Sequence, residues 1–173
     1  MGGSGSGRRE EKYDYTVEDC RSIDSSRWLR EGILKANMRS VGSWAWYTDK
    51  TLTEQRASIG YEIDTESDYG HVRLFYTWRE TEKLDYQVRL ITTPLHFGGR
   101  RWWFVCPNTR CGKKVGKLHL APNSRYFLCR TCQNLTYTSC RDSHKFDSLY
   151  ARLAADTGVP AWAVRRALRK GLP

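Results

Sequence analysis

The sequence predicts an α+β protein in which an antiparallel β meander is followed by a four-cysteine zinc ribbon and a C-terminal helical hairpin. Three observations predict this class. Apolar and polar residues alternate between residues 44 and 105, four cysteines stand in two pairs, and helix-like apolar stripes begin near residue 146. The 173 residues are 39% hydrophobic and 28% charged, as expected of a globular protein. No apolar run approaches the roughly 18 residues of a membrane span, so we expect no transmembrane helix.

We divide the chain into four segments. Residues 1–15 are a flexible arm of glycine, serine and arginine, and residues 16–99 hold short helices and the β meander. The zinc ribbon covers 100–138, and a helix-turn-helix-like helical hairpin covers 139–173. The arm begins MGGSGSGRR, and glycine-rich backbone loses much entropy on ordering. We therefore expect the arm to be ordered only on a partner, with Arg8 and Arg9 contacting nucleic acid.

Helix-start signals come first along the chain, and β strands follow. Thr16 and Asp19 form a potential capping box, and Asp24 can cap a helix over 25–31 before Gly32. Period-two alternation then predicts a four-stranded meander with one buried face and a fifth strand that leads into the first cysteine. These strands are expected at Trp44–Trp46, Ala57–Ile63, Val72–Trp78, Leu84–Leu90 and Arg101–Val105.

Four of the six cysteines form the pattern C-x4-C-x17-C-x2-C. A Zn²⁺ ion takes four thiolates in a tetrahedron, and each short spacer lets one turn supply two of them. Gly112 suits the positive φ that such a turn often needs. Two strands, 115–120 and 126–128, should form a hairpin between the pairs. The predicted ligands of one structural Zn²⁺ are Cys106, Cys111, Cys129 and Cys132; disulfides or a redox pair are the alternatives.

Two apolar stripes of helical period, over 146–156 and 162–168, predict the C-terminal hairpin. Its pattern resembles a helix-turn-helix motif, with a small residue at Ala154, a turn glycine at Gly158 and an aliphatic residue at Val164. The alternative is a helical hairpin with a basic, solvated face. The second helix would present five candidate nucleic-acid contacts: Trp162, Arg165, Arg166, Arg169 and Lys170.

Positive charge is concentrated in the C-terminal part of the chain. Residues 1–97 carry 14 basic and 16 acidic side chains, whereas residues 98–173 carry 15 basic and 3 acidic ones. A block this unbalanced favours a polyanionic partner, DNA or RNA. The candidate phosphate contacts around the ribbon are Arg100, Arg101, Lys113, Lys114, Lys117, Arg125 and Arg130. The N-terminus lacks the apolar region of a signal peptide, so we expect a cytoplasmic protein without a membrane partner.

Several motifs together resemble a family of small uncharacterised bacterial zinc-ribbon proteins. They are the stretch 92–107 (TTPLHFGGRRWWFVCP), the stretch 112–118 (GKKVGKL), the stretches 126–132 and 135–139, and an N-terminus that resembles Gly-Ser-Gly-Arg. The resemblance implies that residues 1–9 are native sequence, and it carries no assigned activity. By analogy of fold, zinc ribbons in recombinases, transposon-encoded nucleases and transcription proteins touch nucleic acid.

The residues offer little that predicts an enzyme. The sequence has no P-loop, no H-E-x-x-H motif and no nucleophile elbow. Asp64, Glu66 and Asp68 could in principle hold Mg²⁺, but they fall in an expected solvated turn. The sequence therefore predicts a nucleic-acid-binding, non-catalytic subunit of a larger DNA- or RNA-processing complex, such as a ribonucleoprotein or mobile-element complex. The alternatives are an adaptor that binds an acidic protein and a metal-dependent nuclease.

Overall fold

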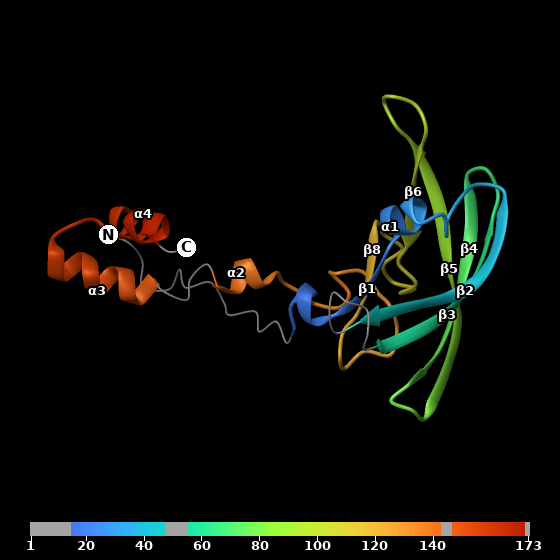
Figure 1. The fold of residues 1–173 in the computed structure, drawn as a ribbon, viewed down its shortest axis with the longest axis horizontal. Coiled ribbons are helices and arrows are strands. Elements are labelled where there is room, and N and C mark those ends of the chain that lie inside the picture. Colours follow the sequence, from blue (N-terminus) through green and yellow to red (C-terminus); the bar gives the residue numbers. More distant parts are fainter. Residues whose placement is uncertain (1–14, 48–54, 143–146, 172–173) are drawn as a thin grey trace. The chain divides into compact units, whose positions relative to one another are not determined.

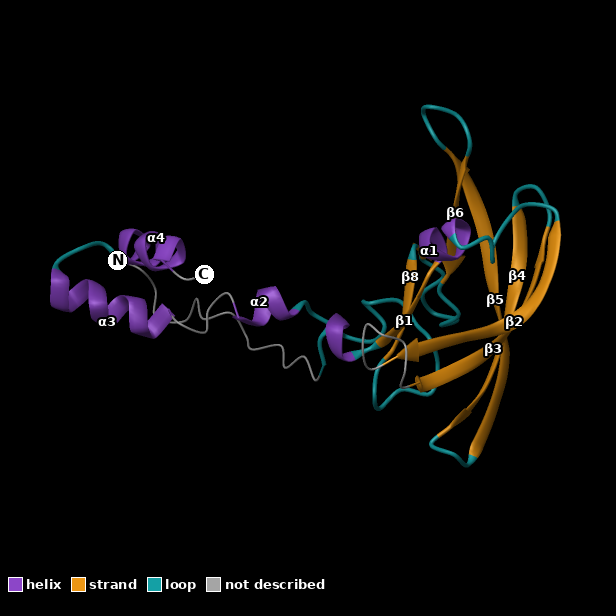
Figure 2. Cartoon of the chain, in the orientation of Figure 1, coloured by secondary structure: helices purple, strands orange, loops and turns teal. Residues whose placement is uncertain are grey.

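A computed structural model describes residues 15–47, 55–142 and 147–171 of the chain. The chain divides into two compact units, Met1–Leu135 and Thr136–Pro173. The first is built mainly of strands and the second of helices (Figures 1 and 2). The structure therefore has the mixed helix and strand content that the sequence predicts.

The main element of the first unit is a six-stranded antiparallel sheet (Figure 1). Its strands follow one another in chain order, so the predicted meander is confirmed. The strands are β2 (Met38–Tyr47), β3 (Gln55–Thr65), β4 (Tyr69–Trp78), β5 (Glu82–Pro94), β6 (Arg100–Val105) and β7 (Lys114–Val115). They extend beyond the alternating cores of the sequence pattern because the ladder pairs polar residues at the strand ends as well.

One face of the sheet is buried, as the alternation predicts. In β4 every second residue from Gly70 to Leu74 is buried. A single hydrophobic cluster runs from Ile23 and Trp28 across the sheet to Phe127 and Cys129. The cysteine segment and the meander therefore share one core.

The opposite face of the sheet carries paired charges. The Arg73 guanidinium lies 3.1 Å from a Glu62 carboxylate oxygen and 2.6 Å from one of Asp85. Arg39 pairs with Asp64 at 3.0 Å. These ion pairs engage Arg39 and Arg73 with carboxylates of the neighbouring strands.

The N-terminal segment adds a strand that the sequence pattern did not indicate. The 3-10 turn Val17–Asp19 and helix α1 (Ser25–Arg30) begin at the predicted caps, and Asp24 accepts hydrogen bonds from the N–H groups of Ser26 and Arg27. Between these helices lies β1 (Arg21–Asp24), which pairs antiparallel with β8 (Lys117–Leu120). This pairing joins the start of the unit to the cysteine segment.

The predicted hairpin between the cysteine pairs differs in the structure. The expected strand 115–120 is divided at Gly116, whose carbonyl accepts hydrogen bonds from the Ser25 backbone and hydroxyl. The expected strand 126–128 contributes only one bridge, from Leu128 to His119. It is held on the sheet instead, because the Phe127 N–H donates to the Tyr86 hydroxyl at 2.9 Å.

Gly70 lies where two strands approach closely. A methyl group added there would stand 2.5 Å from the Asp64 carbonyl oxygen and 2.8 Å from the Thr65 Cα, both backbone atoms. Gly70→Ala should therefore destabilise the protein by about 1–3 kcal/mol, as overpacking does, which chemical denaturation can measure. The matched control is Gly116→Ala, whose added methyl meets nothing closer than 3.8 Å and should be tolerated. Equal stability of the two variants would contradict the argument.

The second unit contains α2 (Thr138–Asp142), α3 (Asp147–Thr157) and α4 (Ala161–Gly171). Helices α3 and α4 form the predicted helical pair. Gly158 ends α3 with φ +69°, and its N–H donates to the Ala154 carbonyl at 2.9 Å. Pro160 directly precedes α4, and its carbonyl accepts hydrogen bonds from the N–H groups of Ala163 and Val164. Among the described residues, no helix is long and apolar enough to cross a membrane.

Candidate metal centre

The four predicted cysteine ligands come together in the first unit. Their sulfur atoms all lie within 4.8 Å of one another. The Cys106 and Cys132 sulfurs are 3.9 Å apart, and those of Cys111 and Cys129 are 3.8 Å apart. None of them is in a disulfide, so the cluster has the donor set and spacing to hold one metal ion.

The first cysteine pair is placed by the end of β6 and a closed loop. Cys106 follows β6 directly, and its N–H donates to the Lys113 carbonyl at 2.9 Å. Asn108 accepts at its backbone carbonyl from Cys111 and donates from its side chain to the Cys132 sulfur at 3.4 Å. Gly112 has φ +58°, as its position after the second ligand predicts.

The second pair lies in a tight turn that resembles the first. The Gln133 N–H donates to the Cys129 carbonyl at 3.0 Å, and Asn134 has a positive φ, +50°, as Gly112 has in the first loop. Gln133 also donates from its side chain to the His119 and Tyr126 carbonyls. This side chain ties the second turn to the segment between the pairs.

The surroundings of the sulfurs affect their protonation. A hydrogen bond from the Lys113 backbone lowers the pKa of the Cys111 thiol to about 7. Burial raises the pKa of Cys106 and of Cys132. The Cys129 N–H points at the Cys106 sulfur at 3.4 Å. A bound metal cation would favour the thiolate form of all four cysteines, because its positive charge offsets the cost of burying negative sulfur atoms.

The seven predicted ribbon cations differ in their partners. Three of them are paired with carboxylates: Arg100 with Asp68, Lys117 with Asp24 and Arg125 with Glu82. In the described part of the chain, no carboxylate lies within ion-pair distance of Arg101, Lys113 or Lys114. The Arg130 guanidinium donates a hydrogen bond to the Leu135 carbonyl at 3.5 Å.

The remaining predicted contacts are not gathered at the cysteine cluster. Arg8 and Arg9 lie outside the described residues. Trp162 is 68% exposed, so it does not anchor the core of the helical pair. Arg165 is 3.8 Å from Asp147 and Arg166 is exposed, both within the second unit. Arg169 and Lys170 lie in α4.

Sequence reasoning missed three features of the surface. Arg110, in the first cysteine loop, is an exposed cation with no carboxylate partner among the described residues. The Arg101 guanidinium lies over the Trp103 ring at 4.1 Å. Phe97 is 98% exposed. The two glycines Gly98 and Gly99 indicate a turn in the sequence. The exposure of Phe97 beside them depends on packing, which a sequence pattern does not report.

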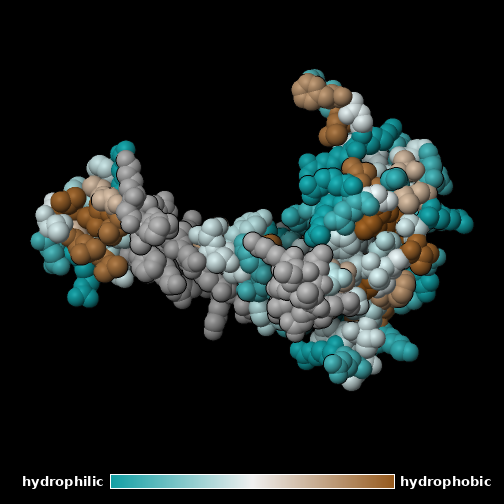
Figure 3. Space-filling model, in the orientation of Figure 1, coloured by the Kyte–Doolittle hydropathy of each residue, from teal (hydrophilic) through white to brown (hydrophobic). Residues whose placement is uncertain are grey.

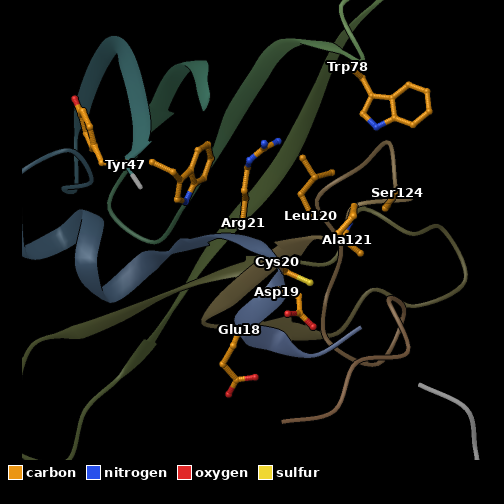
Figure 4. Close-up of a pocket in the computed structure, with 11 residues that line it drawn as sticks. Glu18, Asp19, Cys20, Arg21, Tyr47, Trp78, Leu120, Ala121 and Ser124 are labelled. Carbon is orange, nitrogen blue, oxygen red and sulfur yellow. The ribbon is translucent and has the colours of Figure 1, made fainter. Parts of the chain in front are cut away.

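The described structure does not assemble a catalytic group from the acidic residues. Asp64 and Asp68 are engaged by Arg39 and Arg100, so they do not form a free carboxylate pair for Mg²⁺. A cavity of about 340 Å³ near Cys20 is lined by acidic, aromatic and small side chains (Figure 4). Burial raises the pKa of the Cys20 thiol to about 11, and the thiol donates to the Thr16 carbonyl at 3.2 Å. This cysteine is therefore a poor nucleophile.

Comparison of the chain with protein-family models, with curated proteins and with solved structures finds no match. The chemistry of the cysteine cluster and its surface is thus what bears on function.

Proposed function

We propose that this protein is a nucleic-acid-binding zinc-ribbon protein, a non-catalytic subunit of a larger DNA- or RNA-processing complex. One observation carries the proposal. Residues 98–135 contain eight basic and no acidic side chains. Three of the cations without a carboxylate partner among the described residues lie in or next to the first cysteine loop. Arg110 and Lys113 lie in or next to the first cysteine loop, and Lys114 begins β7.

Zinc is the metal that fits the donor set best. Four thiolates at about 2.3 Å from one ion in a tetrahedron place the sulfurs roughly 3.8 Å apart. Two sulfur pairs of this cluster are 3.8 Å and 3.9 Å apart. The ion would have no open coordination position, so its role is structural. It would fix the first cysteine loop with Arg110 and the adjoining Lys113 and Lys114.

A nucleic acid suits these cations better than an acidic protein does, because planar groups accompany them. Arg101 stacks on Trp103 and is exposed, and a guanidinium plane of this kind can stack on a base as well as bind phosphate. The guanidinium groups of Arg79 and Arg125 both lie over the Trp78 ring, 4.4 Å and 5.4 Å from its centroid. Stacked arginine and tryptophan are typical of surfaces that bind single strands.

The second unit supports membership of a complex. Its helical pair carries an apolar groove of about 300 Å³, lined by residues of α3 and α4 such as Leu153, Val164 and Leu168. Val159 and Leu168 are 42% and 40% exposed. A helix-turn-helix needs a further helix to cover such a groove. We therefore propose that a protein partner or a further helix covers it, and that the exposed Arg166 contacts nucleic acid.

The test reverses the charge at two lysines that have no carboxylate partner in the described structure. Lys113→Glu/Lys114→Glu should weaken binding to every oligonucleotide and flatten the dependence of affinity on salt. The slope should fall by roughly 0.7–0.9 for each phosphate that the variant no longer neutralises. Titrations of duplex DNA, single strands and structured RNA at several salt concentrations measure both effects.

The matched control makes the same change of charge elsewhere on the first unit. Lys35→Glu/Lys83→Glu alters two exposed lysines outside the basic segment, and it should leave the salt slope close to that of the wild type. Equal effects of the two double variants would show that net charge alone matters. Binding of the wild type without any salt dependence would count against phosphate contact and favour the adaptor alternative.

A further inference from the structure

The loop between β5 and β6 projects beyond the sheet and carries hydrophobic surface at its end (Figures 1 and 3). Its two large apolar side chains are both uncovered: Phe97 is 98% exposed and Leu95 is 48% exposed. An exposed apolar residue needs no explanation by itself. Here the conformation of the loop and the charge of the strands that carry it add two independent observations.

The loop is held in a defined turn. The Leu95 N–H donates to the Gly99 carbonyl at 3.1 Å, and the Gly98 N–H donates to the Leu95 carbonyl at 3.1 Å. Gly98 and Gly99 have φ of +85° and +80°, which only glycine adopts at little cost. These hydrogen bonds place Phe97 at the end of the hairpin, where its side chain is exposed.

The parts of β5 and β6 nearest the loop are cationic. From residue 86 to residue 105 the chain has three arginines and no acidic residue. Arg100 is anchored by Asp68 and donates to the Thr92 hydroxyl at 3.2 Å. Arg101 lies on Trp103, whose indole N–H donates to Thr93 at 2.8 Å. The hairpin thus combines an apolar ring at its end with a fixed guanidinium plane near its base.

We infer that the β5–β6 hairpin inserts Phe97 between unpaired bases of a nucleic acid, with Arg101 binding the adjoining phosphate or base. This inference rests on the proposed function and specifies its substrate class: strands with unpaired bases, as at a bulge or a junction. One aromatic ring fits one gap between bases, and apolar side chains enter base steps in this way in other proteins. A lipid surface fits less well, because two apolar side chains bury too little area for stable anchoring.

The experiment compares a hairpin oligonucleotide that has a three-base bulge with its fully paired counterpart, in DNA and in RNA. A 2-aminopurine in the bulge reports stacking by its fluorescence. Phe97→Ala should weaken binding to the bulged probe roughly 5- to 150-fold, and it should abolish the fluorescence change. Binding to the paired probe should stay within about twofold, and the salt slope should be unchanged, because Phe97 neutralises no phosphate.

Two further variants separate stacking from simple hydrophobic contact. Phe97→Trp should preserve binding to the bulged probe, whereas Phe97→Leu, which keeps an apolar side chain but no ring to stack on a base, should bind this probe more weakly than the wild type does. Val41→Ala removes a side chain that is 73% exposed in β2 and is the control for loss of surface area. All four variants should melt as the wild type does, since these side chains pack little.

The outcomes distinguish this inference from the proposed function. Salt-dependent binding that Phe97→Ala leaves intact on the bulged probe would overturn the inference and leave the proposed function in place. A wild-type protein that binds no probe would overturn both. If Phe97→Leu binds the bulged probe as the wild type does, the ring does not stack and the inference fails. It also fails if Phe97→Ala abolishes binding to vesicles of phosphatidylcholine and phosphatidylserine and changes no oligonucleotide affinity.

Discussion

Removal of the proposed zinc ion is expected to unfold the whole first unit and not only the cysteine loops. Cys106 and Cys129 are 3% and 2% exposed and belong to the same hydrophobic cluster as Trp28 and Phe127. The apparent binding free energy of a structural zinc ion is about 10–16 kcal/mol in small zinc domains. This is as large as the net stability of most domains, about 5–15 kcal/mol. Far-UV circular dichroism during titration with a strong chelator should show loss of the β signal.

The cysteine variants give the matched comparison. Cys132→Ser removes one ligand and should lower both the zinc content and the melting temperature. Cys140→Ser changes an exposed cysteine in the second unit and should leave both unchanged. Full zinc content in the Cys132→Ser protein, or an unchanged melting temperature after chelation, would refute the metal centre.

The second large effect is expected from Trp28→Ala. Trp28 is fully buried in α1 and contacts the rings of Trp44, Tyr61 and Phe104, with centroids 5.4–6.0 Å away. Truncation of a buried tryptophan costs about 3–5 kcal/mol, because it removes the transfer free energy and leaves a cavity. The melting temperature should fall by roughly 10–20 °C, which differential scanning calorimetry can measure.

Two other tryptophan variants test whether burial is the cause. Trp28→Phe keeps part of the packing and removes an indole N–H that has no hydrogen-bond partner in the described structure, so its loss should be smaller. Trp162→Ala removes a side chain that is 68% exposed, and it should change stability by less than about 0.5 kcal/mol. Equal destabilisation by Trp28→Ala and Trp162→Ala would contradict the packing described for α1.

The parts of the fold that the sequence predicts are those with local signals. Alternation of apolar residues identified the strands of the meander because one face of the sheet is buried and the other is wet. The cysteine spacing identified the four clustered sulfurs because each pair is brought together by its own short loop. Asp24 and Gly158 marked helix ends through capping and positive φ, which are also local properties.

The parts that were not predicted depend on contacts between distant residues. Arg21–Asp24 resembles the neighbouring helix starts, and it becomes a strand only because Lys117–Leu120 lies beside it. Similarly, 126–128 has the residues of a strand but is held by Tyr86 and the core instead of by a full ladder. The pairing of Arg100 with Asp68 likewise depends on register across the sheet, which charge counts along the chain do not contain.

The pairing of β1 with β8 also fixes an order of events during protein synthesis. The N-terminal strand leaves the ribosome long before its partner, and at about 5–20 residues per second the wait from Asp24 to Lys117 lasts roughly 5–20 s. Cys129 and Cys132 emerge later still. If the four cysteines hold the proposed metal ion, its site is complete only when these last two thiols have emerged, so metal capture would be among the last steps in the folding of the first unit.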